Sequence, residues 1–221
     1  MAVKSIIRTR SNHKCDNIAV LNDSDSMNET SLSLLDRVRG SASDDAWPRL
    51  ADVYSPLLRG WLTRFEIEVT DVDDLVQEVM LTVSRELPRF EHSGRAGAFR
   101  SWLRTILVHR VRDFWRSRKY RPAAAGGSSW AERLEQLEDE SSNASQAWNL
   151  EHDRHVMAQL LENVRPRFEP KTWEAFWRQM YGGQRADIVA AELGMPLNSV
   201  YVARSRVLST LRREAAGLID E

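Results

Sequence analysis

The chain has 221 residues, and its 31 Lys and Arg nearly balance its 32 Asp and Glu, giving a formal net charge of −1. Hydrophobic residues make up 42% of the chain and charged residues 29%, which is typical of a globular protein with one large or two small domains. The single Cys15 excludes an internal disulfide, and no apolar stretch approaches the roughly 20 residues that cross a bilayer. We therefore expect a cytoplasmic protein without membrane insertion.

Apolar residues recur at helical spacing along the chain, and the alternation typical of strands is nearly absent, so we expect an all-α fold of two small helical domains. Residues 1–30 are polar and are expected to form a disordered extension. The helical patterns of 31–121 and of 152–221 predict the two domains. Between them, residues 122–151 begin with Pro, Ala, Gly and Ser and become acidic, with a net charge of −6 over 131–153. We expect this stretch to be a flexible linker.

The helix expected to begin near Thr70 carries four polar side chains in its first turns: Asp73, Asp74, Gln77 and Glu78. Thr70 and Asp73 have the spacing of a capping box, and acids near a helix start complement the helix dipole. Alternatively, the side chains at i, i+3 and i+4 form a docking face for another protein. A metal site would need ligands that the sequence does not supply, and the pair His152 and His155 is most simply explained as surface histidines.

The next helix is strongly basic, because residues 95–121 hold eight Arg and Lys119 against Asp113 alone, a net charge of +8. Leu103, Leu107, Val111 and Phe114 share one stripe, which predicts the core face. The opposite face combines basic groups for phosphates with flat or apolar groups for unstacked bases, as a nucleic-acid surface requires. Its members are Trp102, Thr105, Ile106, His109, Arg112 and Arg116. The alternative is a basic helix that is solvated by water or paired with the acidic linker.

Residues 187–213 have the spacing of a helix-turn-helix. Val189, Ala190 and Leu193 precede Gly194, which suits the turn, and Val200 follows six residues later. On the second helix, Val200, Val207 and Leu211 are expected to point inward. Short polar and Arg side chains suited to a major groove are expected to point outward: Ser199, Val202, Arg206, Ser209 and Arg213.

The sequence contains no catalytic motif, so we expect neither an enzyme nor a bound cofactor or metal. Four interpretations remain at this point: a factor that docks on a partner and binds DNA, a stand-alone helix-turn-helix regulator, a helical metal-carboxylate enzyme, and an interaction scaffold. Two separate Arg-rich faces favour the first two.

Several segments are recognisable. The run Asp73 to Val79, the helix Phe99 to Ile106 and the basic end Asp113 to Arg118 resemble the second conserved region of bacterial extracytoplasmic-function (ECF) sigma factors. The stretch from Val189 through Val200 to Arg206 looks like their fourth region. The resemblance implies a sigma factor that binds core RNA polymerase and directs promoter DNA recognition and melting, with an anti-sigma factor as a further partner.

The resemblance also implies three sets of site residues. Those expected to bind the polymerase are Asp73, Asp74, Gln77, Glu78 and Leu81. Those expected to bind and melt the minus-ten element are Phe90, Arg95, Phe99, Arg100, Trp102, Ile106, His109, Arg112 and Arg116. Those expected to read the minus-thirty-five element are Asn198, Ser199, Val202, Ser205, Arg206, Ser209 and Arg213.

Overall fold

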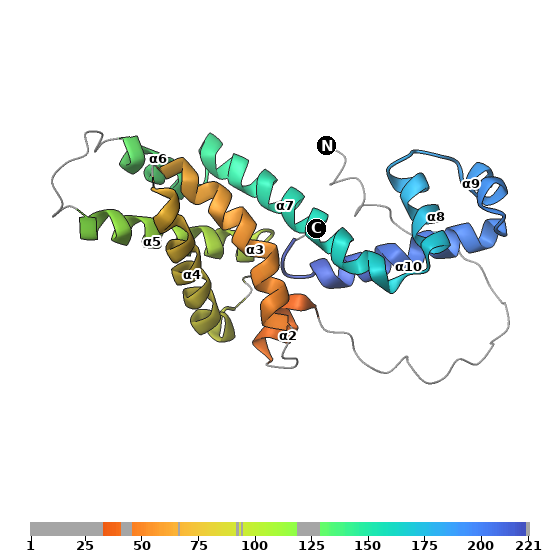
Figure 1. The fold of residues 1–221 in the computed structure, drawn as a ribbon, viewed down its shortest axis with the longest axis horizontal. Helices are drawn as coiled ribbons and strands as arrows, with labels where there is room; N and C mark the ends of the chain where they lie inside the picture. Colours follow the sequence, from red (N-terminus) through yellow and green to blue (C-terminus); the bar gives the residue numbers. More distant parts are fainter. Residues whose placement is uncertain are drawn as a thin grey trace. The chain divides into compact units, whose positions relative to one another are not determined.

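A computed structural model describes residues 33–40, 46–65, 67–91, 93, 95–118 and 129–219 of the chain. Every regular element in these residues is a helix, which confirms the all-α prediction (Figure 1). None of the described helices is long and apolar enough to cross a membrane. The expected extension 1–30 lies outside the described residues. Contacts divide the chain into two compact units, one of residues 34–163 with the described residues after Glu214, the other of 164–214.

The first unit begins with a helical bundle. Its elements are α2 (Leu34–Arg39), α3 (Ala46–Leu62), η1 (Thr63–Phe65), α4 (Val69–Glu86), η2 (Leu87–Arg89) and α5 (Ala98–Arg118). Helix α3 packs against α2 and α4, and α4 packs against α5. The packing follows from amphipathic sequences, because residues three or four apart, such as Leu75, Val79 and Val83 of α4, are buried on one side.

Two further helices belong to the same unit, namely α6 (Ser129–Glu138) and α7 (Asn143–Val164). Helix α6 packs against α5 and η1 and buries Leu134 and Leu137, while α7 buries Trp148. The structure therefore differs from the expected flexible linker, since 129–138 and 143–151 are helical and packed. Their acidic composition conceals a few large apolar side chains at helical spacing, and these are enough to attach both helices.

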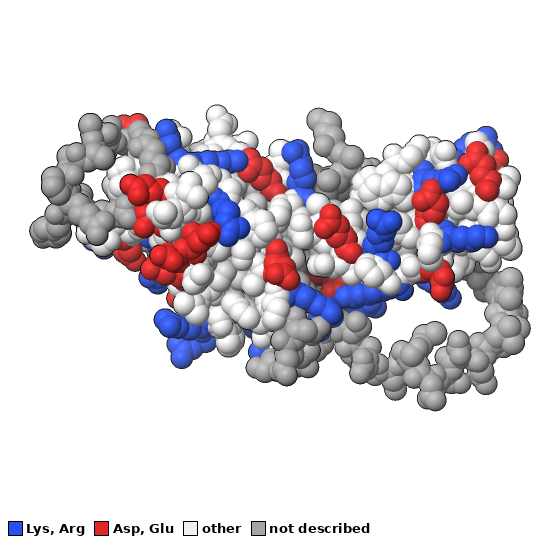
Figure 2. All heavy atoms as spheres, viewed as in Figure 1, with Lys and Arg blue, Asp and Glu red and all other residues white. Residues whose placement is uncertain are grey.

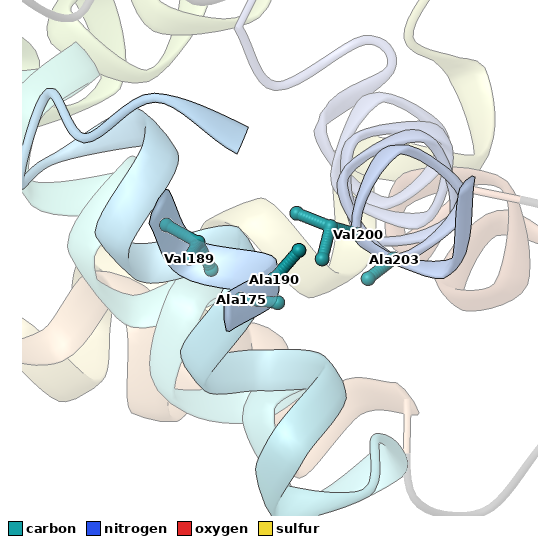
Figure 3. Packing of buried hydrophobic residues seen from close by; sticks show 5 residues of the cluster. All are labelled: Ala175, Val189, Ala190, Val200 and Ala203. Atoms are coloured by element: carbon teal, nitrogen blue, oxygen red, sulfur yellow. The ribbon is translucent and has the colours of Figure 1, made fainter. Parts of the chain in front are cut away.

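The second unit contains η3 (Arg165–Arg167), α8 (Pro170–Met180), α9 (Ala186–Leu193) and most of α10 (Leu197–Ala215). In Figure 3 the side chains of its core point toward one another from α8, α9 and α10. They are Ala175, Val189, Ala190, Val200 and Ala203. Three of the five are alanines, and small side chains allow the helix backbones to approach closely.

Gly194 ends α9 in the left-handed conformation, with φ of 60°. The next amide, of Met195, donates to the Ala190 carbonyl at 2.9 Å, which closes the helix before the turn into α10. The predicted helix-turn-helix, with a glycine at its turn, is present.

Candidate functional site

One long face of α4 lies open. Asp74, Gln77, Glu78 and Leu81 are exposed at the spacing i, i+3, i+4 and i+7, and we call them the α4 acidic face. Leu81 is 53% exposed, although it is a large apolar side chain. Figure 2 shows acidic side chains gathered over the part of the molecule where Figure 1 places the start of α4. An open face that combines carboxylates with an apolar residue is suited to docking on a basic protein surface.

Asp73 differs from its neighbours because it is paired inside the unit. Its Oδ1 accepts hydrogen bonds from Nε and Nη2 of Arg59 on α3, at 2.9 and 2.6 Å. The predicted capping box is wrong, since α4 starts at Val69 and the residue before it, Glu68, makes no side-chain cap. Asp73 therefore joins α3 to α4, and Asp74 and Glu78 supply the charge of the open face.

A pocket lies where the loop before α5 meets the start of that helix. Its lining includes three residues predicted for minus-ten DNA, Phe90, Arg95 and Arg100, together with Arg104 of α5 and Asn149 of α7. Two of its polar atoms, Nε of Arg100 and Oδ1 of Asn149, are buried without a hydrogen-bond partner in the described part of the chain. Because these two atoms are almost inaccessible to solvent, they lie behind the pocket wall, and exposed polar groups of the lining, such as Arg95, are the ones that a ligand would meet.

Aromatic rings support this pocket. Phe90 lies with its ring centroid 4.8 Å from that of Trp102 and 5.8 Å from that of Phe99. Phe99 is only 1% exposed and Phe90 8%, whereas Trp102 is half-buried. Phe99 thus packs behind the other two rings, and Trp102 presents part of its indole to solvent.

The basic helix α5 is paired with acidic residues that follow it in the chain. Nη1 of Arg100 lies 2.9 and 3.0 Å from the two carboxylate oxygens of Asp153. Nη2 of Arg104 lies 3.3 Å from Oε1 of Glu140, and Nη2 of Arg112 lies 2.7 Å from Oε2 of Glu138. The Arg112 hydrogen bond lowers the pKa of Glu138 below its ordinary value. The structure therefore contains the pairing that was the alternative interpretation of this helix, in which its arginines pair with the acidic stretch that follows it.

His109 and Arg116 are exposed farther along α5. Arg116 lies 3.5 Å from the Asp113 carboxylate of its own helix. Arg116 lies beyond Arg112, which pairs with α6, whereas His109 lies between Arg104 and Arg112.

His152 is fully buried between α7 and α3, so its prediction as a surface residue is wrong. The Tyr54 hydroxyl donates to Nε2 at 3.1 Å, and Nδ1–H donates to the Asp153 carboxylate at 3.1 Å. Burial lowers the pKa of His152 and raises that of Tyr54 well above its ordinary value. His155, one turn later, donates from Nε2 to the Val53 carbonyl at 2.6 Å. The two histidines therefore attach α7 to α3.

Among the described residues, no three His, Cys, Asp or Glu side chains are placed to hold a metal ion.

The buried and exposed residues of α10 follow the predicted pattern. Val200, Val207 and Leu211 are buried, with at most 3% exposure. Asn198, Val202, Ser205, Arg206 and Ser209 are exposed, and Ser199 and Arg213 are half-buried. Arg178 of α8 pairs with Glu174 of its own helix at 2.6 Å and with Glu192 at 2.8 Å, and the second pair links α8 to α9.

Comparison with known proteins identifies the first unit. A family model for Sigma-70 region 2 matches residues 50–121. Over 145 residues the chain is 30% identical to ECF RNA polymerase sigma factor ShbA of Streptomyces griseus subsp. griseus, an alignment that spans 64% of this chain and 70% of that protein. Over 153 residues it is 26% identical to the probable RNA polymerase sigma factor RfaY of Xanthomonas campestris pv. campestris, spanning 69% of this chain and 36% of that protein.

The chain belongs to the ECF sigma factors. As a sigma factor it acts in transcription initiation, where it binds core RNA polymerase and promoter DNA. The matched region contains the α4 acidic face and the whole of α5 up to Arg118.

The structure corrects two predicted contact residues of the sigma factor and adds two others. Phe99 is 1% exposed and packs behind the pocket, so its prediction as a minus-ten contact is wrong. Ile106 is 6% exposed, so its prediction as an exposed contact residue is wrong. The periodicity of α5 predicts one buried side, and it cannot reveal that a second helix, α6, also packs against α5. Arg104 and Asn149 line the pocket but were not predicted. Arg104 belongs to the recognised basic run, whereas Asn149 lies in the expected linker and carried no signal.

Proposed function

We propose that the α4 acidic face is the surface of this sigma factor that docks on core RNA polymerase. The proposal is supported by its exposure and by the apolar opposite side of α4, which packs into the bundle. Asp74, Glu78 and Gln77 would contact basic and polar groups, and Leu81 would fill an apolar site. Asp73 would act by joining α4 to α3 through Arg59.

The pocket before α5 would take an unpaired base of the minus-ten element. Melting a duplex costs a few kcal/mol of unstacking per base, and a pocket that stacks and hydrogen-bonds the freed base offsets part of that cost. Phe90 would provide a ring surface there, backed by the half-buried ring of Trp102, and Arg95 is exposed in the pocket lining. His109, Arg112 and Arg116 would contact the backbone along α5.

The outer face of α10 would read the minus-thirty-five element in the major groove. Its Ser and Asn side chains suit base edges, and Arg206 suits either a phosphate or a guanine. Ala203 belongs to the buried core of the motif and does not contact DNA in this arrangement.

The proposal is carried by one arrangement of side chains: each of two separately packed units has a face with exposed arginine and polar side chains, and the first unit also has an acidic face that DNA would repel. A sigma factor needs all three surfaces, whereas a regulator that binds DNA alone has no use for the third. On this proposal the protein has no catalytic activity of its own and acts in the cytoplasm, where the polymerase is. Control by an anti-sigma factor that covers one of the surfaces remains a prediction from the resemblance.

The promoter assignments are tested with holoenzyme reconstituted from the chain and core polymerase. Promoter fragments selected by this holoenzyme from a random-sequence pool serve as templates for in vitro transcription. Arg206→Ala should relax selection within the upstream half of the site and weaken binding by about 1–3 kcal/mol if Arg206 contacts a base. Arg165→Ala, at an exposed position on η3 of the same unit, is the control. Equal effects of the two substitutions would overturn the role given to α10.

A further inference from the structure

Three arginines of α5 have a carboxylate partner that lies beyond the region matched by the family model. The Sigma-70 region 2 match ends at residue 121. The partners lie after it: Asp153 of α7 for Arg100, Glu140 in the turn after α6 for Arg104, and Glu138 of α6 for Arg112. We call these three carboxylates the acidic cover. Two of their arginines, Arg100 and Arg112, are predicted minus-ten contacts, and the third, Arg104, lines the pocket.

The acidic cover is held in place by packing that does not involve charge. Trp130 at the start of α6 stacks on Trp115 near the end of α5, with ring centroids 5.4 Å apart and planes 17° from parallel. Leu134 and Leu137 are buried beneath α6, and Arg133 donates to the Arg64 carbonyl at 2.6 Å. Helix α6 therefore lies along the basic helix at a defined position, and its carboxylates face defined guanidinium groups.

The individual ion pairs are nevertheless exchangeable. The Arg112–Glu138 pair is open to water, with 35% and 52% exposure, and such pairs contribute little stability. In the Arg104–Glu140 pair the carboxylate is 80% exposed, whereas Arg104 is 5% exposed. The Arg100–Asp153 pair is deeper, with 16% and 21% exposure. A DNA backbone that displaced the outer carboxylates would gain the entropy of counterion release, which the exchange of one carboxylate for another does not provide.

We infer that the acidic cover occupies the DNA-binding arginines of α5 in the free sigma factor, and that the minus-ten strand displaces Glu138 and Glu140 when the promoter is bound. The inference rests on the proposed function of the pocket and α5. The acidic segment is thus a built-in competitor for the minus-ten surface. The acidic cover reduces the binding of the free sigma factor to DNA, because an uncovered basic surface would bind DNA of any sequence.

The test compares two variants of the full chain that change the charge equally. Glu138→Gln/Glu140→Gln removes the outer part of the acidic cover. Glu132→Gln/Glu135→Gln, at exposed positions of α6 that make no ion pair within the described residues, is the matched control. Binding of a fluorescent single-stranded DNA of arbitrary sequence is measured by anisotropy, without polymerase. We expect the first variant to bind about fivefold more tightly than the control, as two exposed ion pairs of about 0.5 kcal/mol imply. The difference should shrink as salt is added.

Equal affinities of the two variants would overturn the inference. Failure of both variants and of the wild type to bind the DNA would overturn it as well, because the arginines under the cover would then not be a DNA surface. Co-elution of each variant with core polymerase is measured in parallel. If both variants co-elute with core polymerase and bind DNA equally, the acidic cover is contradicted but the proposed docking is not. If the wild type does not co-elute with core polymerase, the proposed docking is contradicted.

Discussion

The role of a residue in this fold is set either by its own backbone, as for Gly194, or by side chains of a distant helix, as for His152. Gly194 was assigned to the helix-turn-helix turn from its position after Leu193, and its φ of 60° agrees. His152 was misjudged, because the partner that buries it, Tyr54, lies 98 residues away in the sequence. A local pattern identifies residues whose role is set by the backbone, but it cannot identify a side chain whose surroundings come from a distant helix.

His152 should make the first unit sensitive to mild acid. Burial lowers its pKa in the folded state below the ordinary value of 6.5, so between the two values the unfolded chain binds a proton that the folded chain does not. Stability is therefore full above pH 6.5 and falls as the pH decreases, by at most about 1.4 kcal/mol per pH unit for this one group. The groups around the ring are Tyr54, Asp153, Arg100 and His155.

Urea unfolding of the wild type and of His152→Gln, followed by tryptophan fluorescence at a series of pH values, measures this effect. Gln can hydrogen-bond but does not titrate, so the variant should be less stable at pH 7 and should lose less stability on acidification. An unchanged slope in the variant would assign the acid sensitivity to other groups.

Gly194→Ala should destabilise the second unit by about 1–2 kcal/mol, because an L-residue with a Cβ is strained in the left-handed conformation. No atom lies within 4 Å of the added Cβ, so the cost comes from the backbone and not from a clash. Thermal unfolding of the full chain checks this, with Ala191→Gly, at an exposed position of α9, as a substitution of comparable size. Gly194→Asn should recover part of the loss, since Asn tolerates this conformation better than Ala.

At the scale of elements, the helices that pack on one side only were predicted best. The period of α4 and α10 separates their buried and exposed residues correctly, as Val79 and Val207 in the core and Glu78 and Arg206 at the surface show. Helix α5 was predicted less well because it is covered from two directions, by α4 and by α6. The sequence places α6 inside a flexible linker, because its Gly- and Ser-rich approach and its acidic composition are also those of a linker.

Removal of one side chain should test whether α6 is part of the folded unit. Leu137 is fully buried, so Leu137→Ala should cost about 2–5 kcal/mol of unfolding free energy. Leu150→Ala, at a site that is 57% exposed on α7, should cost less than about 1 kcal/mol. Urea unfolding of the two variants measures the difference. Equal small effects would mean that α6 contributes little to the stability of the unit.

At the scale of the molecule, the DNA surfaces proposed for the two units are each small. The outer face of α10 has few basic side chains, and part of the basic surface of α5 is paired internally. Weak separate contacts become specific when both units are held on one partner, because binding of the first raises the effective concentration of the second. Core polymerase is that partner for a sigma factor, and the account therefore depends on the docking surface more than on either DNA surface.

The α4 acidic face is tested most directly by co-elution of the purified chain with core RNA polymerase on gel filtration. The account predicts co-elution of the wild type and a loss of affinity of at least tenfold for Asp74→Ala/Glu78→Ala, with the thermal unfolding curve unchanged. Glu132→Ala/Glu135→Ala, which removes the same charge from exposed positions on α6, should co-elute as the wild type does. Full co-elution of the Asp74→Ala/Glu78→Ala variant would contradict the account.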